Sequence, residues 1–114
     1  MSPFELEHQE TEDPDLLHVA VSGELDLTNA RELEDRVREL TAGEASLLVL
    51  DLNRVVFIDS AALHVLFRTA RRGRTGIVLA QTAPVARTVE IVGLSNAAVV
   101  GESLDAVLAA LGAG

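Results

Sequence analysis

The pattern of apolar and polar positions changes period several times along the chain, and each period predicts one kind of element. Apolar and polar residues alternate over residues 4–8 and again over residues 15–23, which is the two-residue period of a half-buried strand. The segment ETEDPD at residues 10–15 separates the two strands and is rich in turn-forming residues. We therefore expect a hairpin at the start of the chain, with its second strand closing at Gly23.

The next segment, residues 28–40, changes to the period of a helix. Its apolar stripe consists of Ala30, Leu33, Val37 and Leu40. Either Thr28 or Asn29 can cap the first turn, because both side chains can accept a hydrogen bond from a backbone N–H. Two pairs of opposite charge stand four residues apart, as ion pairs on a helix do: Glu32 with Arg36, and Glu34 with Arg38.

The middle of the chain begins with SLLVLDL at residues 46–52, a continuous apolar run typical of a strand buried on both faces. A second apolar run starts at residue 55 and stops at Asp59 and Ser60, where a helix begins. The remaining predicted elements are a strand at residues 76–80, a helix from Pro84 to Gly93, a strand at residues 97–100 and a helix capped by Ser103. Strands that alternate with helices predict an α/β domain with a mixed, mostly parallel sheet, about four helices and an N-terminal hairpin.

Composition and charge narrow the function of such a domain. A length of 114 residues predicts a single domain over residues 1–114. Cysteine is absent, which excludes disulfides, thiol catalysis and thiolate metal sites, and the net charge of −9 argues against direct nucleic-acid binding. No apolar run approaches the roughly 18 to 20 residues of a membrane span, and the polar start does not resemble a signal peptide. We therefore expect a cytoplasmic protein that is not inserted in a membrane.

Catalytic motifs are not found in the sequence. It contains no glycine-rich phosphate loop, and its three histidines are not spaced as metal ligands are. A triad could be imagined from Asp59, Ser60 and His64, but no G-x-S-x-G elbow surrounds the serine, and one helical turn between base and nucleophile is a poor geometry. We predict that the protein is not an enzyme and that it uses no cofactor and no metal.

The helix that begins at Ser60 is expected to have two distinct faces. Its predicted core face consists of Leu63, Leu66, Phe67 and Ala70, and the opposite face of Ser60, His64, Arg68 and Arg71, with Ala61, Val65 and Arg72 beside them. Ala61 and Val65 would then form a small exposed apolar patch next to Ser60. Asp59 and Ser60 are also ordinary capping residues, so the local pattern leaves a helix cap and a docking spot both open.

Two longer motifs add a further observation. VSGELDLTNARELEDRV at residues 21–37, followed by VLDLNRVVFIDSAAL at residues 49–63, resembles the anti-sigma factor antagonists, the single-domain STAS proteins. The resemblance implies a partner switch, in which the unmodified antagonist binds an anti-sigma factor that is also a serine kinase and so frees a sigma factor. Phosphorylation by that kinase ends the binding, and a PP2C-type phosphatase restores it.

Residue by residue, the resemblance implies that Ser60 is the phosphorylated serine, that Asp59 is the acid before it, and that Asp26 is the acid closing the GELD turn. The implied partner-binding residues are Asp26, Thr28, Asp59, Ala61, Ala62, His64, Val65 and Arg68. This chain has Ala62 where a glycine is common and His64 where a small residue is common. These departures motivate an alternative hypothesis, a STAS subunit that regulates a transporter or another multi-protein complex without phosphorylation.

Overall fold

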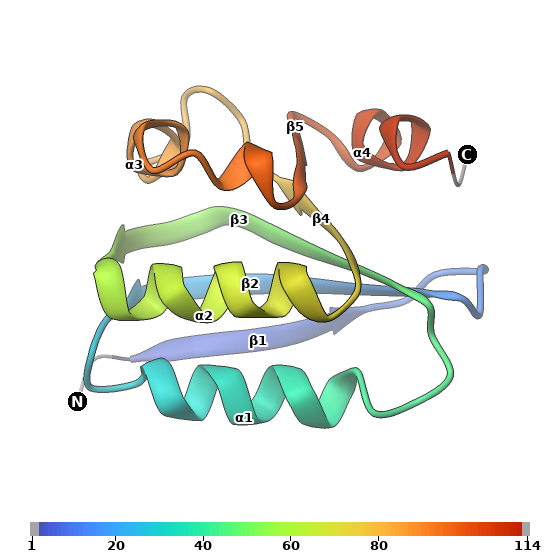
Figure 1. The fold of residues 1–114 in the computed structure, drawn as a ribbon, viewed down its shortest axis with the longest axis horizontal. Helices are drawn as coiled ribbons and strands as arrows, with labels where there is room; N and C mark the ends of the chain where they lie inside the picture. Colours follow the sequence, from blue (N-terminus) through green and yellow to red (C-terminus); the bar gives the residue numbers. More distant parts are fainter. Residues whose placement is uncertain (1–2, 113–114) are drawn as a thin grey trace.

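A five-stranded mixed sheet forms the frame of the protein. In the computed structural model, which describes residues 3–112, the strands lie in the order β1-β2-β3-β4-β5 (Figure 1). The bounds of the strands are Phe4–Gln9 for β1, Leu16–Leu25 for β2, Leu47–Ile58 for β3, Arg74–Val78 for β4 and Val99–Gly101 for β5. β1 is antiparallel to β2 and the other neighbouring pairs are parallel, so the predicted hairpin and mostly parallel sheet are confirmed. Residues 1–2 and 113–114 of the predicted 1–114 domain lie outside the described residues.

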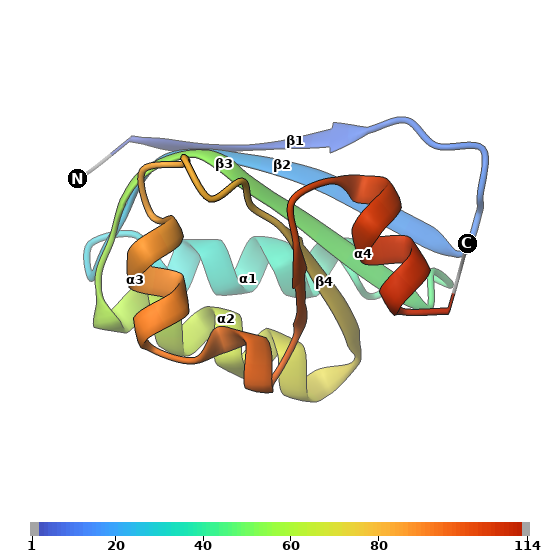
Figure 2. The same cartoon turned by 90° about the horizontal axis from the view of Figure 1, so that it is seen from above.

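The sheet is covered by four α-helices, as the sequence predicted. Their bounds are Ala30–Leu40 for α1, Ser60–Arg72 for α2, Ala86–Ile91 for α3 and Leu104–Ala110 for α4, and a short 3₁₀ turn, η1, spans Leu94–Asn96. Both views show α1 and α2 side by side (Figures 1 and 2). The amino ends of these two helices lie at the same end of the molecule, where β2 and β3 finish, so the segments that lead into them are neighbours.

Successive side chains of the central strands point to opposite faces of the sheet, and each face has its own core. The larger core includes Val19, Leu50 and Ile77, and it is closed by α1, α2 and α3. The smaller core includes Val49 and Val78 together with Val107 of α4. The beginning of β3 is therefore buried on both faces, which confirms the interpretation of its continuous apolar run.

Strand ends are where the structure differs from the sequence-based expectation. β2 does not close at Gly23 but continues to Leu25, so the strand includes the first three residues of GELD and the turn starts at Asp26. Gly23 has a φ of +98° beside a register shift, and a Cβ there would come within 2.3 Å of the Pro3 carbonyl oxygen. Glycine adopts this conformation without strain, so the strand bulges and continues instead of stopping.

β3 is also longer than predicted, because the two apolar runs at residues 46–52 and 55–58 belong to one strand of 12 residues. Its pairing with β4 ends at Asp51, whereas its pairing with β2 continues to Ile58. The last part of β3 therefore extends past β4 toward the start of α2. This extension carries the chain to the corner that contains Ser60.

Candidate functional site

The corner between β3 and α2 is built by Asp59. Its backbone is extended, and its Oδ1 accepts a hydrogen bond from the Ala62 N–H at 3.1 Å. Asp59 is therefore the N-cap, a position that favours aspartate because the side chain satisfies an otherwise unpaired N–H and lies at the positive end of the helix dipole. Ser60 is the first residue of the helix and is exposed. The sequence left open whether Ser60 is a helix cap or a docking spot, and the interpretation of Ser60 as the cap is wrong, because Asp59 is the N-cap and Ser60 is the first helical residue.

The second carboxylate oxygen of Asp59 binds another part of the chain. Oδ2 accepts a hydrogen bond from the Leu27 N–H at 3.0 Å, and the Asp59 N–H donates to the Leu25 carbonyl oxygen at 3.1 Å. One side chain thus joins the start of α2 to the loop between β2 and α1. This link places Asp59 beside the loop that contains Asp26.

The buried side chain of Asn29 stabilises the β2–α1 loop, residues 26–29, by hydrogen bonds to nearby backbone groups. This side chain is 1% exposed; its Oδ1 accepts from the Asp26 N–H at 3.0 Å, and its Nδ2 donates to the Glu24 carbonyl oxygen at 2.8 Å. The Asp26 carboxylate in turn accepts from both the N–H and the hydroxyl of Thr28. These bonds fix the loop in a conformation that leaves the Leu27 side chain 77% exposed.

Exposed apolar side chains occur on the segments that lead into α1 and α2, but they are not the ones predicted. Leu27 comes from the β2–α1 loop, and Phe57, 49% exposed, comes from the end of β3, where it pairs in register with Glu24. Val56 beside it is 59% exposed. The pattern gave no indication of Leu27, a single apolar residue in a turn, and it did not assign a face to the apolar run before Asp59. The signal in that run is its continuity: its four apolar residues are consecutive, at positions 55–58, so alternate side chains must point to opposite faces of the strand.

The prediction of an exposed apolar patch on α2 is wrong for Val65. Val65 is 1% exposed and Ala62 is fully buried, whereas Ala61 is only half-buried. The helix buries a wider stripe than predicted because it contacts α1 along its side as well as the sheet beneath it. Ala62 and Val65 are therefore buried beneath the surface next to Ser60. They pack under this surface and are not part of it.

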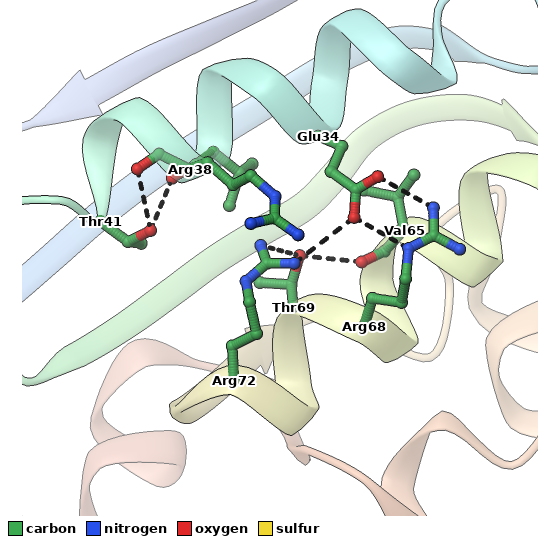
Figure 3. A network of polar contacts seen from close by, with 8 residues as sticks. Glu34, Arg38, Thr41, Val65, Arg68, Thr69 and Arg72 are labelled. Atoms are coloured by element: carbon green, nitrogen blue, oxygen red, sulfur yellow. Dashed lines mark hydrogen bonds and ion pairs between the residues drawn. The ribbon is translucent and has the colours of Figure 1, made fainter.

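Two arginines of α2, Arg68 and Arg72, bind α1. Arg68 binds the Glu34 carboxylate through Nε at 2.8 Å and a terminal nitrogen at 3.0 Å, and Arg72 approaches the same carboxylate at 3.4 Å (Figure 3). The hydrogen bond from Arg68 lowers the pKa of Glu34, and burial acts in the opposite direction. Glu34 was expected to pair with Arg38 on its own helix, but its ion pairs within 4 Å go to α2. The bidentate geometry adds specificity to the packing of the two helices.

A shallow hollow of about 500 Å³ lies between α1 and α2 next to the corner. Its lining consists of Leu27, Ala30, Arg31, Glu34, Asp35, Ala61, His64 and Arg68. Of the predicted partner-binding residues, Ala61, His64 and Arg68 thus meet at one surface, close to the loop of Asp26 and Thr28. Within residues 3–112, no group of three or more acidic, histidine or cysteine side chains is placed to hold a metal ion. No helix in the same range has the length and apolarity needed to cross a membrane.

The fold and the corner define a class of small α/β module that presents a serine at the first turn of a helix, flanked by rigidly held apolar side chains. Residues 7–106 match the family model of the STAS domain, and the chain belongs to this family. The chain is 30% identical to the anti-sigma-F factor antagonist RsfB of Mycobacterium tuberculosis over 81 residues, which cover 68% of this chain and 66% of RsfB, slightly less than two thirds.

Solved structures agree with the fold. A crystal structure of an anti-sigma factor antagonist from Mycobacterium paratuberculosis is 27% identical and superposes with a TM-score of 0.82, covering 95% of this chain and 93% of that one. The Bacillus cell fate determinant SpoIIAA in its phosphorylated form is 18% identical with a TM-score of 0.59, covering 96% and 99%. At that identity, the second comparison supports the fold alone.

Proposed function

We propose that this protein is an anti-sigma factor antagonist that binds its anti-sigma factor at the β3–α2 corner. The observation that carries the proposal is an exposed Ser60 at the first position of α2, beside the fixed and exposed Leu27. The similarity to RsfB and to the mycobacterial antagonist structure supports it. Within residues 3–112, no hydrogen bond joins the Ser60 hydroxyl to a histidine or a carboxylate, and we propose a binding role for the corner in place of catalysis.

Leu27 and Phe57 are the proposed apolar anchors of this interface. Each is held by backbone pairing or by side-chain hydrogen bonds, so a partner orders little of the surface when it binds. The proposed rim around the anchors is polar apart from Ala61, and it consists of Asp26, Thr28, Asp59, Ala61, His64 and Arg68. The two predicted residues that are buried, Ala62 and Val65, act by setting the height and position of the α2 surface.

Phosphorylation of Ser60 is the proposed off switch. A serine kinase, which we propose is the anti-sigma factor itself, transfers the γ-phosphoryl group of ATP to the Ser60 oxygen and leaves ADP and a proton. The helix tolerates the new charge of about −1.5 to −2 because its amino end is positive, but an interface fitted to a neutral hydroxyl loses its complementarity. A loss of about 3 kcal/mol would weaken binding more than a hundredfold. A PP2C-type phosphatase would reverse the change.

The test is to mix the purified protein with a candidate anti-sigma factor, measure binding by calorimetry, and map phosphate after addition of ATP by mass spectrometry. We expect phosphate at Ser60 and at least a hundredfold weaker binding for Ser60→Asp. Ser103→Asp is a matched control, because Ser103 is also an exposed serine at a helix start, on α4. Equal binding of the wild type and Ser60→Asp would contradict the proposal.

The alternative, a STAS subunit of a transporter or another complex without a phosphorylation cycle, gives different results. Co-purification with a membrane complex, and no phosphate on Ser60, would favour it. An enzyme that uses Ser60 as a nucleophile would be labelled at Ser60 by an electrophilic serine probe, and we expect no labelling.

A further inference from the structure

His64 follows Ser60 by four positions on α2, and both residues are exposed. Residues four apart on a helix have Cβ atoms roughly 6 Å apart on the same face. A phosphoryl group on the Ser60 oxygen extends beyond the hydroxyl and comes within reach of the imidazole ring. Histidine changes its charge near neutral pH, so it can be a cation beside such a group.

Of the other basic side chains on α2 and α1 near the corner, Arg31 belongs to α1, and Arg71 lies about three helical turns beyond Ser60 on α2. Arg68 and Arg72 both bind Glu34, which draws their charges toward the middle of α2 and away from its first turn. His64 lines the hollow between the helices, and within residues 3–112 no carboxylate lies within 4.0 Å of its ring in an ion pair. It is therefore the ionisable group on α2 that is best placed to meet a phosphate on Ser60.

The charges that face His64 come from three elements. On α2 they are Arg68 and Arg71; on α1 they are Arg31, Glu34 and Asp35; and at the corner they are Asp26 and Asp59. Glu34 is neutralised by two arginines, and Arg31 and Asp35 have opposite charges one turn apart. A phosphate dianion would be the largest new charge in this surrounding, and its field at His64 would not be cancelled by the others.

We propose that His64 binds the phosphate of phosphorylated Ser60 as its counter-cation and so sets the charge of the modified corner. This inference rests on the proposed phosphorylation of Ser60. The phosphate favours the protonated imidazole, and the imidazolium favours the fully ionised phosphate. Near neutral pH, the protonated fraction of His64 is then larger in the phosphorylated protein than in the unmodified one. The imidazolium offsets part of the charge of about −1.5 to −2 that the phosphate adds.

The test uses the full chain with phosphoserine introduced genetically at position 60, so that it does not depend on knowing the kinase. The ring protons of His64 are followed by NMR between pH 5 and 9 in the unmodified and phosphorylated proteins, and the phosphate is followed by ³¹P NMR. We expect the midpoint of the His64 titration to move upward by about half a pH unit or more, as a helical i,i+4 pair with a doubly charged partner implies. His8 and His18, on β1 and β2, are internal controls that should not move.

A second measurement tests whether His64 is the residue that binds the phosphate. In the phosphorylated His64→Gln variant, the second ionisation of the phosphate should shift to higher pH than in the phosphorylated wild type, and in His8→Gln it should not. An unchanged His64 midpoint, or a phosphate titration that is the same in wild type and His64→Gln, would overturn the inference. Neither result touches the proposed function, which would instead fail if the phosphorylated and unmodified proteins bound the anti-sigma factor equally.

Discussion

Asp59 offers the sharpest test of how the corner is built, because its two carboxylate oxygens serve different segments. Asp59→Ala removes the cap on the Ala62 N–H at 3.1 Å and the bond to the Leu27 N–H at 3.0 Å. Loss of an N-cap costs about 1 kcal/mol, and loss of a hydrogen bond to a charged acceptor costs about 1.5 kcal/mol. We therefore expect Asp59→Ala to lower the free energy of unfolding by about 2–3 kcal/mol, which corresponds to a fall in Tm of about 8–12 °C.

Two further variants separate the contributions. Asp59→Asn keeps an oxygen for the Ala62 N–H but turns an NH₂ group toward the Leu27 N–H. It should therefore lower the free energy of unfolding by only about half as much as Asp59→Ala does. Ser103→Ala is the matched control for a cap alone, because the Ser103 hydroxyl caps α4 by accepting from the Ala106 N–H at the same distance of 3.1 Å. It should cost about 1 kcal/mol.

Urea unfolding followed by far-ultraviolet circular dichroism measures these differences, since the chain contains no tryptophan or tyrosine to report by fluorescence. Amide hydrogen exchange at Leu27 reports the second bond directly, and it should accelerate in both Asp59 variants but not in Ser103→Ala. If Asp59→Ala were no more destabilising than Ser103→Ala, and exchange at Leu27 were unchanged, the reasoning that one carboxylate joins the loop to α2 would be refuted.

Three other perturbations test the loop, the bulge and the ion pair. Asn29→Ala removes both hydrogen bonds that a buried amide makes to the backbone, so we expect a loss of about 2–3 kcal/mol by urea unfolding, and a loss below 1 kcal/mol would contradict this. Gly23→Ala forces a Cβ against the Pro3 carbonyl oxygen at a positive φ and should cost about 2 kcal/mol or more; an unchanged urea midpoint would argue against the strain. Because Arg68 lowers the pKa of Glu34 from its ordinary value of 4.5, the stabilisation is present above that value and is lost as the pH falls through the lowered pKa. The difference in Tm between wild type and Glu34→Gln should therefore be largest near pH 7 and shrink in acid, and a constant difference from pH 7 to pH 3 would speak against it.

The order of elements could be predicted from the sequence because it depends on local periodicity. The alternation before Gly23, the continuous run that begins β3 and the stripe of α1 each reflect the surface on which that segment packs. Capping residues were also visible locally, as Ser103 at the start of α4 shows. The family motifs could also be recognised from the sequence, because each is one continuous stretch of the chain. Together they contain the residues that build the corner.

The errors in the exposure of Val65 and in the ion pair of Glu34 share one physical cause, which is contact between segments far apart in the chain. Val65 was expected to be exposed because a single helix viewed alone has one buried stripe, whereas α2 is covered on two sides. Glu34 was expected to bind Arg38 on its own helix, but the packing of α1 against α2 brings Arg68 and Arg72 closer. Periodicity carries no information about which helix lies beside another.

By itself, the sequence determined the α/β class, the four helices, the hairpin and the place of Ser60 at the start of a helix. Only the tertiary structure decided what surrounds that serine. Leu27 and Phe57 are exposed because a buried Asn29 and the two oxygens of Asp59 hold the loop, and because β3 extends past β4. Local pattern records which residues prefer to be buried, whereas exposure at a corner depends on the elements that meet there.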